Sequence, residues 1–81
     1  MTDRDIFEMI NGLSAEEERL FATAGDGGGL SGEEIQRLEE IQVQLDRCYD
    51  LLHQRQARRV VGLDPDDAKP RPGSVVEGYE Q

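Results

Sequence analysis

Asp50 and His53 are the two side chains of this sequence whose types and spacing are suited to binding a metal ion. On a helix, positions three apart share one face, and helical di-iron proteins hold their metals with such carboxylate and histidine pairs. Glu17, a carboxylate on the inner side of the preceding helix, is about 15 residues or about 22 Å away along the helix axis. One chain cannot complete the site, so the alternative hypothesis is a metal-binding bundle completed by N-terminal acidic residues of a second chain. We favour a solvent-exposed polar end and expect no metal and no cofactor.

Cys48 is the only cysteine, which excludes an intramolecular disulfide and indicates a reducing, cytoplasmic setting. It falls on the apolar seam of a predicted helix, where a thiol usually packs as a small hydrophobic group. His53 follows five positions later, roughly 140° around a helix from the thiol, and does not face it. We therefore expect no catalytic residue and no enzymatic activity.

Arg55, Arg58 and Arg59 form the one basic cluster, near the end of a predicted helix. Cations there complement the negative end of the helix dipole, which is a sufficient explanation of the cluster. The functional alternative is an acidic partner, for example residues 3–24 of a second chain, which hold six acidic and two basic side chains. Both interpretations remain open. The glycines within 25–29 do not form a phosphate loop, because neither Gly-Lys-Ser nor Gly-Lys-Thr follows them.

Two predicted helices must position these residues, and the first spans about 3–24. It begins with a capping-box pattern at Thr2 and Asp5. Its apolar residues follow a heptad pattern, with Glu17 at one seam position and the others occupied by Ile6, Ile10, Leu13, Leu20 and Ala24. The dipeptide Asn11-Gly12 allows a break. We favour a continuous helix, since an interior glycine costs only about 1 kcal/mol and the heptad continues without a shift.

A glycine-rich joint at 25–30 separates this helix from a second one at about 32–61. Ser31 and Glu34 form a capping box at its start, and Gly62 suits the left-handed position after its end. The seam of the second helix consists of Leu38, Ile41, Leu45, Cys48 and Leu52. Both helices therefore carry matching heptads.

The short turn also predicts which residues lie level across the two helices. Ile6 is expected beside Tyr49, and Glu17 beside Leu38. A polar residue in a seam can fix register if it finds a partner, and for Glu17 that partner would be Arg37 or a symmetry mate.

The expected fold is all-α: an antiparallel, coiled-coil-like two-helix hairpin formed by residues 1–61. An extended tail at 62–81 contains all three prolines and has few apolar groups until its end. Val75, Val76 and Tyr79 near the C-terminus either dock or fray. Docking within the chain and docking on a partner both remain open.

Two helices offer a small shared core, because the chain has 81 residues, 36% of them hydrophobic, and no tryptophan. The apolar surface is nonetheless wider than one seam, through Phe7, Met9, Phe21, Val43 and Leu51. We therefore expect a non-enzymatic interaction protein that forms a homodimer, with two hairpins in a four-helix bundle and partner binding through the tail as a further option. The residues assigned to self-association or partner binding are Phe7, Met9, Leu13, Phe21, Leu45, Leu52, Arg55, Arg58, Arg59 and Tyr79.

The chain is acidic, with a formal net charge of -9 and a pI of about 4.4. Such a chain repels phosphate backbones, so we do not expect a nucleic-acid partner. The start lacks the basic and apolar run of a secretory signal, and charged residues interrupt each window long enough to cross a bilayer. We expect no membrane partner and a cytoplasmic location.

Several stretches together resemble one protein family. They are Gly27-Gly28-Gly29-Leu30-Ser31, Val43-Gln44-Leu45-Asp46 with Cys48 and Asp50-Leu51-Leu52, Arg55-Gln56-Ala57-Arg58-Arg59, Gly62-Leu63-Asp64-Pro65 and Val75-Val76-Glu77-Gly78-Tyr79. The chain resembles, over nearly its whole length, the small actinobacterial proteins grouped as domain of unknown function 2630 (DUF2630). The resemblance implies a hairpin, a bacterial cytosolic setting and a tail that is part of the domain, and it implies no catalytic residue. Arg19, where members often carry histidine, and Asn11-Gly12 depart from the family pattern and weaken any site on the first helix.

Overall fold

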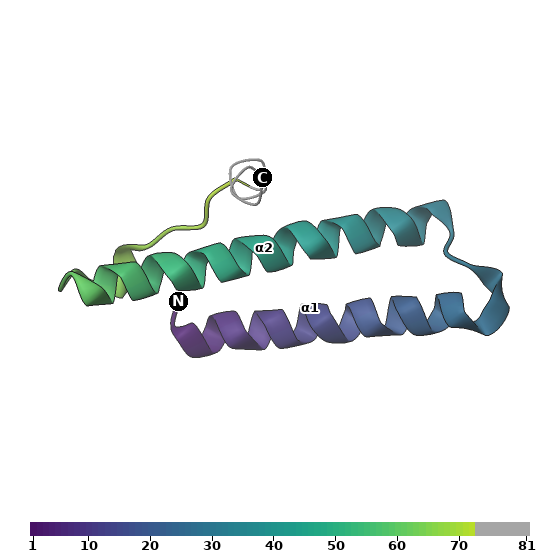
Figure 1. Cartoon of the computed structure of the whole chain (residues 1–81), viewed down its shortest axis with the longest axis horizontal. Helices are drawn as coiled ribbons and strands as arrows, with labels where there is room; N and C mark the ends of the chain where they lie inside the picture. The colour runs from purple at the N-terminus through teal and green to yellow at the C-terminus, as the bar shows by residue number, and fades with distance from the viewer. Residues whose placement is uncertain (73–81) are drawn as a thin grey trace.

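The computed structural model describes residues 1–72, apart from the side chain of Asp26. Two helices, α1 (Asp3–Thr23) and α2 (Gly32–Val60), lie side by side and run in opposite directions (Figure 1). A wide turn of π type, η1 (Ala24–Gly28), follows α1, and a short 3-10 turn, η2 (Pro65–Asp67), follows α2. The described residues contain no strand, which confirms the all-α prediction for two packed helices. Each helix ends one residue before its predicted limit.

The start of α1 is fixed by the expected capping box. The amide of Asp5 donates to the hydroxyl of Thr2 at 3.2 Å, and the amide of Thr2 donates to the carboxylate of Asp5 at 2.9 Å. These two bonds satisfy donors that a helix start leaves unpaired. The helix then passes through Asn11 and Gly12 without interruption, so the prediction of a continuous first helix is confirmed.

The hinge between the helices depends on Gly27. Its φ of 96° lies in the left-handed region, where a Cβ atom is strained, and it bends the chain inside η1. The predicted joint begins at residue 25; the helical turns in fact extend to Gly28, and the bend falls inside them. The second helix then starts with its predicted capping box, in which the amide of Glu34 donates to Ser31 Oγ at 3.2 Å.

The end of α2 is a Schellman motif. The amide of Leu63 donates to the carbonyl of Arg58 at 2.8 Å, and the amide of Gly62 donates to the carbonyl of Arg59 at 3.2 Å. Gly62 has a φ of 78°, as this motif requires. The chain therefore reverses direction directly after α2.

The hydrophobic core is small. Among the described residues, the buried hydrophobic side chains are Ile6, Ile10, Ile41, Cys48 and Leu51. Leu13, Leu45, Leu52 and Ala68 pack against this core while remaining partly exposed. Leu51 was expected to add to the uncovered apolar surface and Leu52 to the seam; the structure instead buries Leu51, on the side of α2 that the tail covers.

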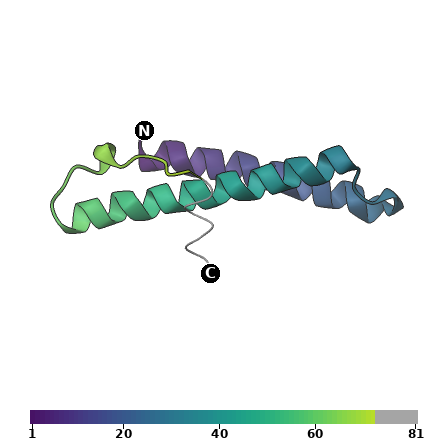
Figure 2. The ribbon, with the colours of Figure 1, turned by 90° about the horizontal axis from the view of Figure 1, so that it is seen from above.

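The described part of the tail returns along α2 (Figures 1 and 2). Gln54 Nε2 donates to the carbonyl of Lys69 at 2.8 Å, and Arg47 Nε donates to the carbonyl of Arg71 at 3.0 Å. Ala68 packs against the core. This part of the tail therefore docks within the chain. Val75, Val76 and Tyr79 lie outside the described residues.

Candidate functional site

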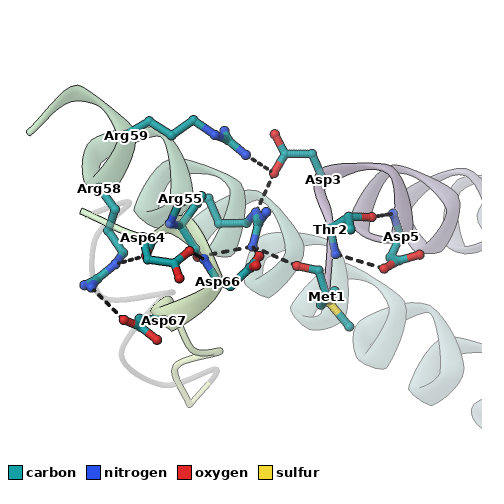
Figure 3. A network of polar contacts seen from close by, with 11 residues as sticks. Met1, Thr2, Asp3, Asp5, Arg55, Arg58, Arg59, Asp64, Asp66 and Asp67 are labelled. Carbon is teal, nitrogen blue, oxygen red and sulfur yellow. Dashed lines mark hydrogen bonds and ion pairs between the residues drawn. The ribbon is translucent and has the colours of Figure 1, made fainter. Parts of the chain in front are cut away.

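Arg55 lies where three segments of the chain meet, and its exposed fraction is only 5% (Figure 3). Its Nε donates to Asp3 Oδ1 at 2.5 Å, and its Nη1 donates to the carbonyl of Met1 at 2.7 Å. The same Nη1 reaches the carbonyl of Pro65 and the carboxylate of Asp66, both at 3.1 Å. One guanidinium thus joins the start of α1, the last turns of α2 and η2.

Arg58 and Arg59 extend this cluster on either side (Figure 3). Arg59 Nη2 donates to Asp3 Oδ1 at 2.7 Å. Arg58 Nε donates to the carbonyl of Asp64 at 2.6 Å, and its Nη2 lies 3.5 Å from the carboxylate of Asp67. We name Arg55, Arg58 and Arg59, together with the acidic residues that they bind, the arginine clasp. Those acidic residues are Asp3, Asp64, Asp66 and Asp67.

The clasp changes the acidity of its members. Hydrogen bonds from Arg59 and then Arg55 lower the pKa of Asp3 to about 2. The hydrogen bond to Asp3 raises the pKa of Arg55 despite the burial of the guanidinium. Both groups stay ionised across the physiological range, so the clasp is a permanent set of ion pairs rather than a proton-transfer device.

The structure therefore gives the basic cluster a role that sequence reasoning did not assign. Helix-dipole complementation and an acidic partner were the two interpretations; Arg58 and Arg59 lie in the last turn of α2, and Arg55, Arg58 and Arg59 also bind acidic residues of their own chain. A signal was present in the sequence, because Asp3 and the Asp64-Pro65-Asp66-Asp67 stretch place carboxylates on both sides of the last turns of α2.

A second ion pair joins the helices nearer the hinge. Arg37 Nε and Nη2 donate to the two carboxylate oxygens of Glu16 at 2.5 and 2.7 Å, and Nη1 reaches Glu40 at 3.3 Å. This contact lowers the pKa of Glu16. Arg37 was one of the two partners considered for Glu17, the other being a symmetry mate. Glu16 takes that place because successive residues differ by about 100° around the helix, and Glu16 lies on the side that faces Arg37.

Cys48 lies beside a hollow of about 130 Å³ between the helices and the tail, with Met9, Leu51 and Pro70 among its lining residues. Burial raises the pKa of the thiol, which lowers the fraction of reactive thiolate. The hollow is apolar, and His53 lies exposed on another side of α2. Cys48 therefore behaves as the small core residue that the sequence predicted.

The carboxylate and histidine pair of α2 is not joined by further ligands within the described chain. Asp50 accepts from Gln54 Nε2 at 2.9 Å and lies 3.1 Å from Arg71 Nε. Across residues 1–72 no three side chains of His, Cys, Asp or Glu lie close enough together to hold a metal ion. The same residues include no helix with the length and apolar character needed to cross a membrane.

The remaining residues assigned to self-association separate into two groups. Phe7, Met9 and Phe21 are exposed, each by about half. Leu13, Leu45 and Leu52 are partly buried against the core. Tyr79 lies outside the described residues. Among the described residues, the aromatic side chains of α1 are thus exposed to solvent, whereas the arginines are bound to acidic residues of the same chain.

Comparison with known proteins places the chain among relatives of undetermined function. The model of a family described as protein of unknown function (DUF2630) matches residues 2–81. "Uncharacterized protein Rv0898c" of Mycobacterium tuberculosis is 46% identical over 78 residues, which cover 96% of this chain and 90% of the relative. "Uncharacterized protein Mb0922c" of Mycobacterium bovis has the same identity and coverage. These matches confirm the resemblance drawn from the sequence. No solved structure matches the chain.

Proposed function

Because the chain belongs to the DUF2630 family, whose description assigns no activity, we propose a function from its own geometry: a non-enzymatic helical module that pairs with a second copy of itself. The paired form is a dimer in which two hairpins make a four-helix bundle. The observation that carries the proposal is that, among residues 1–72, α1 and α2 keep large apolar side chains half exposed although the described part of the tail packs along α2.

The size of the core supports the need for a second subunit. Five hydrophobic side chains are buried among the described residues. Domains below about 70–80 residues rarely gain more than a few kcal/mol from one core, and they commonly rely on a disulfide, a metal or oligomerisation. With Cys48 as the single cysteine, an intramolecular disulfide is excluded. Oligomerisation is the source of stability that the exposed apolar groups themselves can supply.

The arginine clasp indicates that the charged and the exposed apolar side chains have different roles in this chain. Its guanidinium groups are engaged with Asp3, Asp64, Asp66 and Asp67, so they hold the hairpin and tail together. Binding of the second copy then depends on apolar contacts rather than on these charges. This differs from an adaptor that captures an acidic partner through Arg55, Arg58 and Arg59.

Sedimentation equilibrium of the full chain tests the proposal. The expected result is a species of twice the chain mass of 9.1 kDa at micromolar concentration, dissociating on dilution. The Arg4→Ala chain serves as control, because Arg4 is highly exposed and its ion pair with Glu8 lies within α1. A single 9.1 kDa species at all concentrations, with a cooperative thermal transition, would overturn the proposal.

A further inference from the structure

Four half-exposed apolar side chains lie on one side of the hairpin, and we call them the open face. Phe7 and Phe21 belong to α1 and have exposed fractions of 52% and 51%; Ile35 and Tyr49 belong to α2, with 46% and 48%. Large apolar side chains exposed on one side of a charged protein are typical of an interaction site.

The open face lies opposite the tail. On α1, Met9 lines the hollow beside Pro70 of the tail, and Phe7, two residues earlier, is roughly 160° around the helix from Met9. On α2, Arg47 holds the tail through the carbonyl of Arg71, and Tyr49, two residues later, is roughly 160° around the helix from Arg47. Both helices therefore turn these side chains away from the surface that the tail covers.

The two halves of the open face repeat with the same spacing. Phe7 and Phe21 are fourteen positions apart, as are Ile35 and Tyr49, which is about 21 Å along each helix. Because the helices are antiparallel, Phe7 and Tyr49 both lie in the half of the hairpin that is away from the hinge, while Phe21 and Ile35 lie near the hinge. The face thus has two equal apolar ends, a geometry that a two-fold axis through its middle can superpose.

Two open faces can stack with their hairpins parallel or antiparallel, and the distribution of charge along the hairpin favours one of these arrangements. Residues 13–43, the hinge half, carry eight acidic and two basic side chains. The other described residues, 1–12 and 44–72, carry eight acidic and seven basic side chains and are nearly neutral. Stacking hinge on hinge opposes two strongly acidic halves, whereas antiparallel stacking places each acidic half against a nearly neutral one.

We infer that the open face binds the open face of a second copy with the two hairpins antiparallel, so that the Phe7 and Tyr49 end of one chain meets the Phe21 and Ile35 end of the other. The inference rests on the proposed self-association and adds its surface and orientation. The exposed halves of three aromatic rings and one isoleucine supply roughly 400 Å² of apolar surface per chain. That is most of the apolar area in an interface of about 800 Å² per partner.

A matched pair of charge substitutions tests the surface. Phe21→Glu introduces a carboxylate into the open face, and Met9→Glu introduces one on the tail side at a similarly exposed methionine. We expect Phe21→Glu to weaken the dimer at least about 30-fold and Met9→Glu to leave it within about threefold of the unchanged chain. Far-UV circular dichroism checks that both chains remain helical.

Mixing two charged chains tests the orientation and does not depend on a single variant folding well. Phe7→Lys and Phe21→Glu chains should each dimerise weakly alone. Mixed, they should form a heterodimer at least about tenfold tighter than either homodimer, because the antiparallel arrangement brings the new lysine to the new glutamate. A parallel arrangement separates these two positions and gives no rescue.

The outcomes separate this inference from the proposed function. A dimeric unchanged chain whose affinity falls with Met9→Glu but not with Phe21→Glu, or whose charged variants show no rescue, overturns the surface or the orientation alone. A monomeric unchanged chain overturns both. If that monomer dimerises only after Tyr79→Ser, then the C-terminal residues, and not a second copy, cover the open face.

Discussion

At the scale of single residues, Arg55 has the most consequential position in the chain. A buried guanidinium is costly to desolvate, and it is tolerated here because its donors reach two carboxylates and two carbonyls. Those acceptors come from segments far apart in sequence. Arg55 therefore converts three local elements into one packed unit.

Arg55→Lys should destabilise the protein although it keeps the charge. An ammonium group is a point donor and cannot reproduce the planar fork that serves Asp3 and the Met1 carbonyl together. We expect the Tm to fall by roughly 5–10 °C, measured by circular dichroism at neutral pH. Arg4→Ala, at an exposed surface pair, is the control and should stay within about 2 °C. Equal melting of both variants would show that the clasp does not hold the fold together.

Asp3 predicts how the clasp responds to acid. Its pKa falls from 3.8 to about 2 on folding, so its stabilising effect is complete above 3.8 and disappears as the pH drops through 2. Asp3→Asn should therefore lower the Tm at pH 7, and the difference from the unchanged chain should shrink between pH 4 and pH 2. Thermal melts across this range measure it, with Glu8→Gln as control. A constant difference at all pH values would contradict the assigned ion pairs.

At the scale of elements, the helix limits were predictable because the signals are local. Capping boxes at Thr2 and Ser31 and the Gly62 reversal each involve residues within a few positions of one another. The heptad pattern did not predict that Leu51 would be fully buried in the core and Leu52 only partly buried. It depends on the tail, whose return along α2 is set by contacts between residues about fifteen to twenty-four positions apart.

The hinge offers a matched pair of glycines. Gly27 has a positive φ and Gly28 does not, and an added Cβ meets no atom within 4 Å at either position. Gly27→Ala should therefore destabilise by about 1 kcal/mol through backbone strain alone. Gly28→Ala should be neutral or slightly stabilising, since it restricts the unfolded chain. Chemical denaturation measures both, and equal effects would contradict the described bend.

The reactivity of Cys48 reports whether the tail is docked, because the tail helps to cover this thiol. The buried thiol should react slowly with an alkylating reagent in the unchanged chain. Ala68→Asp places a charge where the tail packs on the core, and we expect it to raise the alkylation rate at least about tenfold by local opening. Lys69→Ala is the control, because the tail contact uses only the carbonyl of Lys69. Unchanged reactivity in the Ala68→Asp chain would mean that the tail does not protect the core.

At the scale of the whole molecule, the described residues 1–72 form two unlike sides. The tail and the arginine clasp close one side, and the open face of Phe7, Phe21, Ile35 and Tyr49 remains on the other. The sequence indicated surplus apolar width but not its placement, because the side that the tail covers is a tertiary property. Met9 and Phe7 both widened the apolar stripe in the sequence, and the position of Pro70 beside Met9 shows which of the two lies on the side that the tail covers.

The concentration dependence of thermal unfolding tests the central claim most directly, since a hairpin that depends on a second copy is stabilised by mass action. We predict that the Tm of the full chain rises by several degrees between about 1 µM and about 100 µM, while the unfolding curve of Phe21→Glu shifts downward and becomes nearly concentration-independent. A Tm that is the same at both concentrations for the unchanged chain would show that two helices and a tail suffice, and would contradict the account.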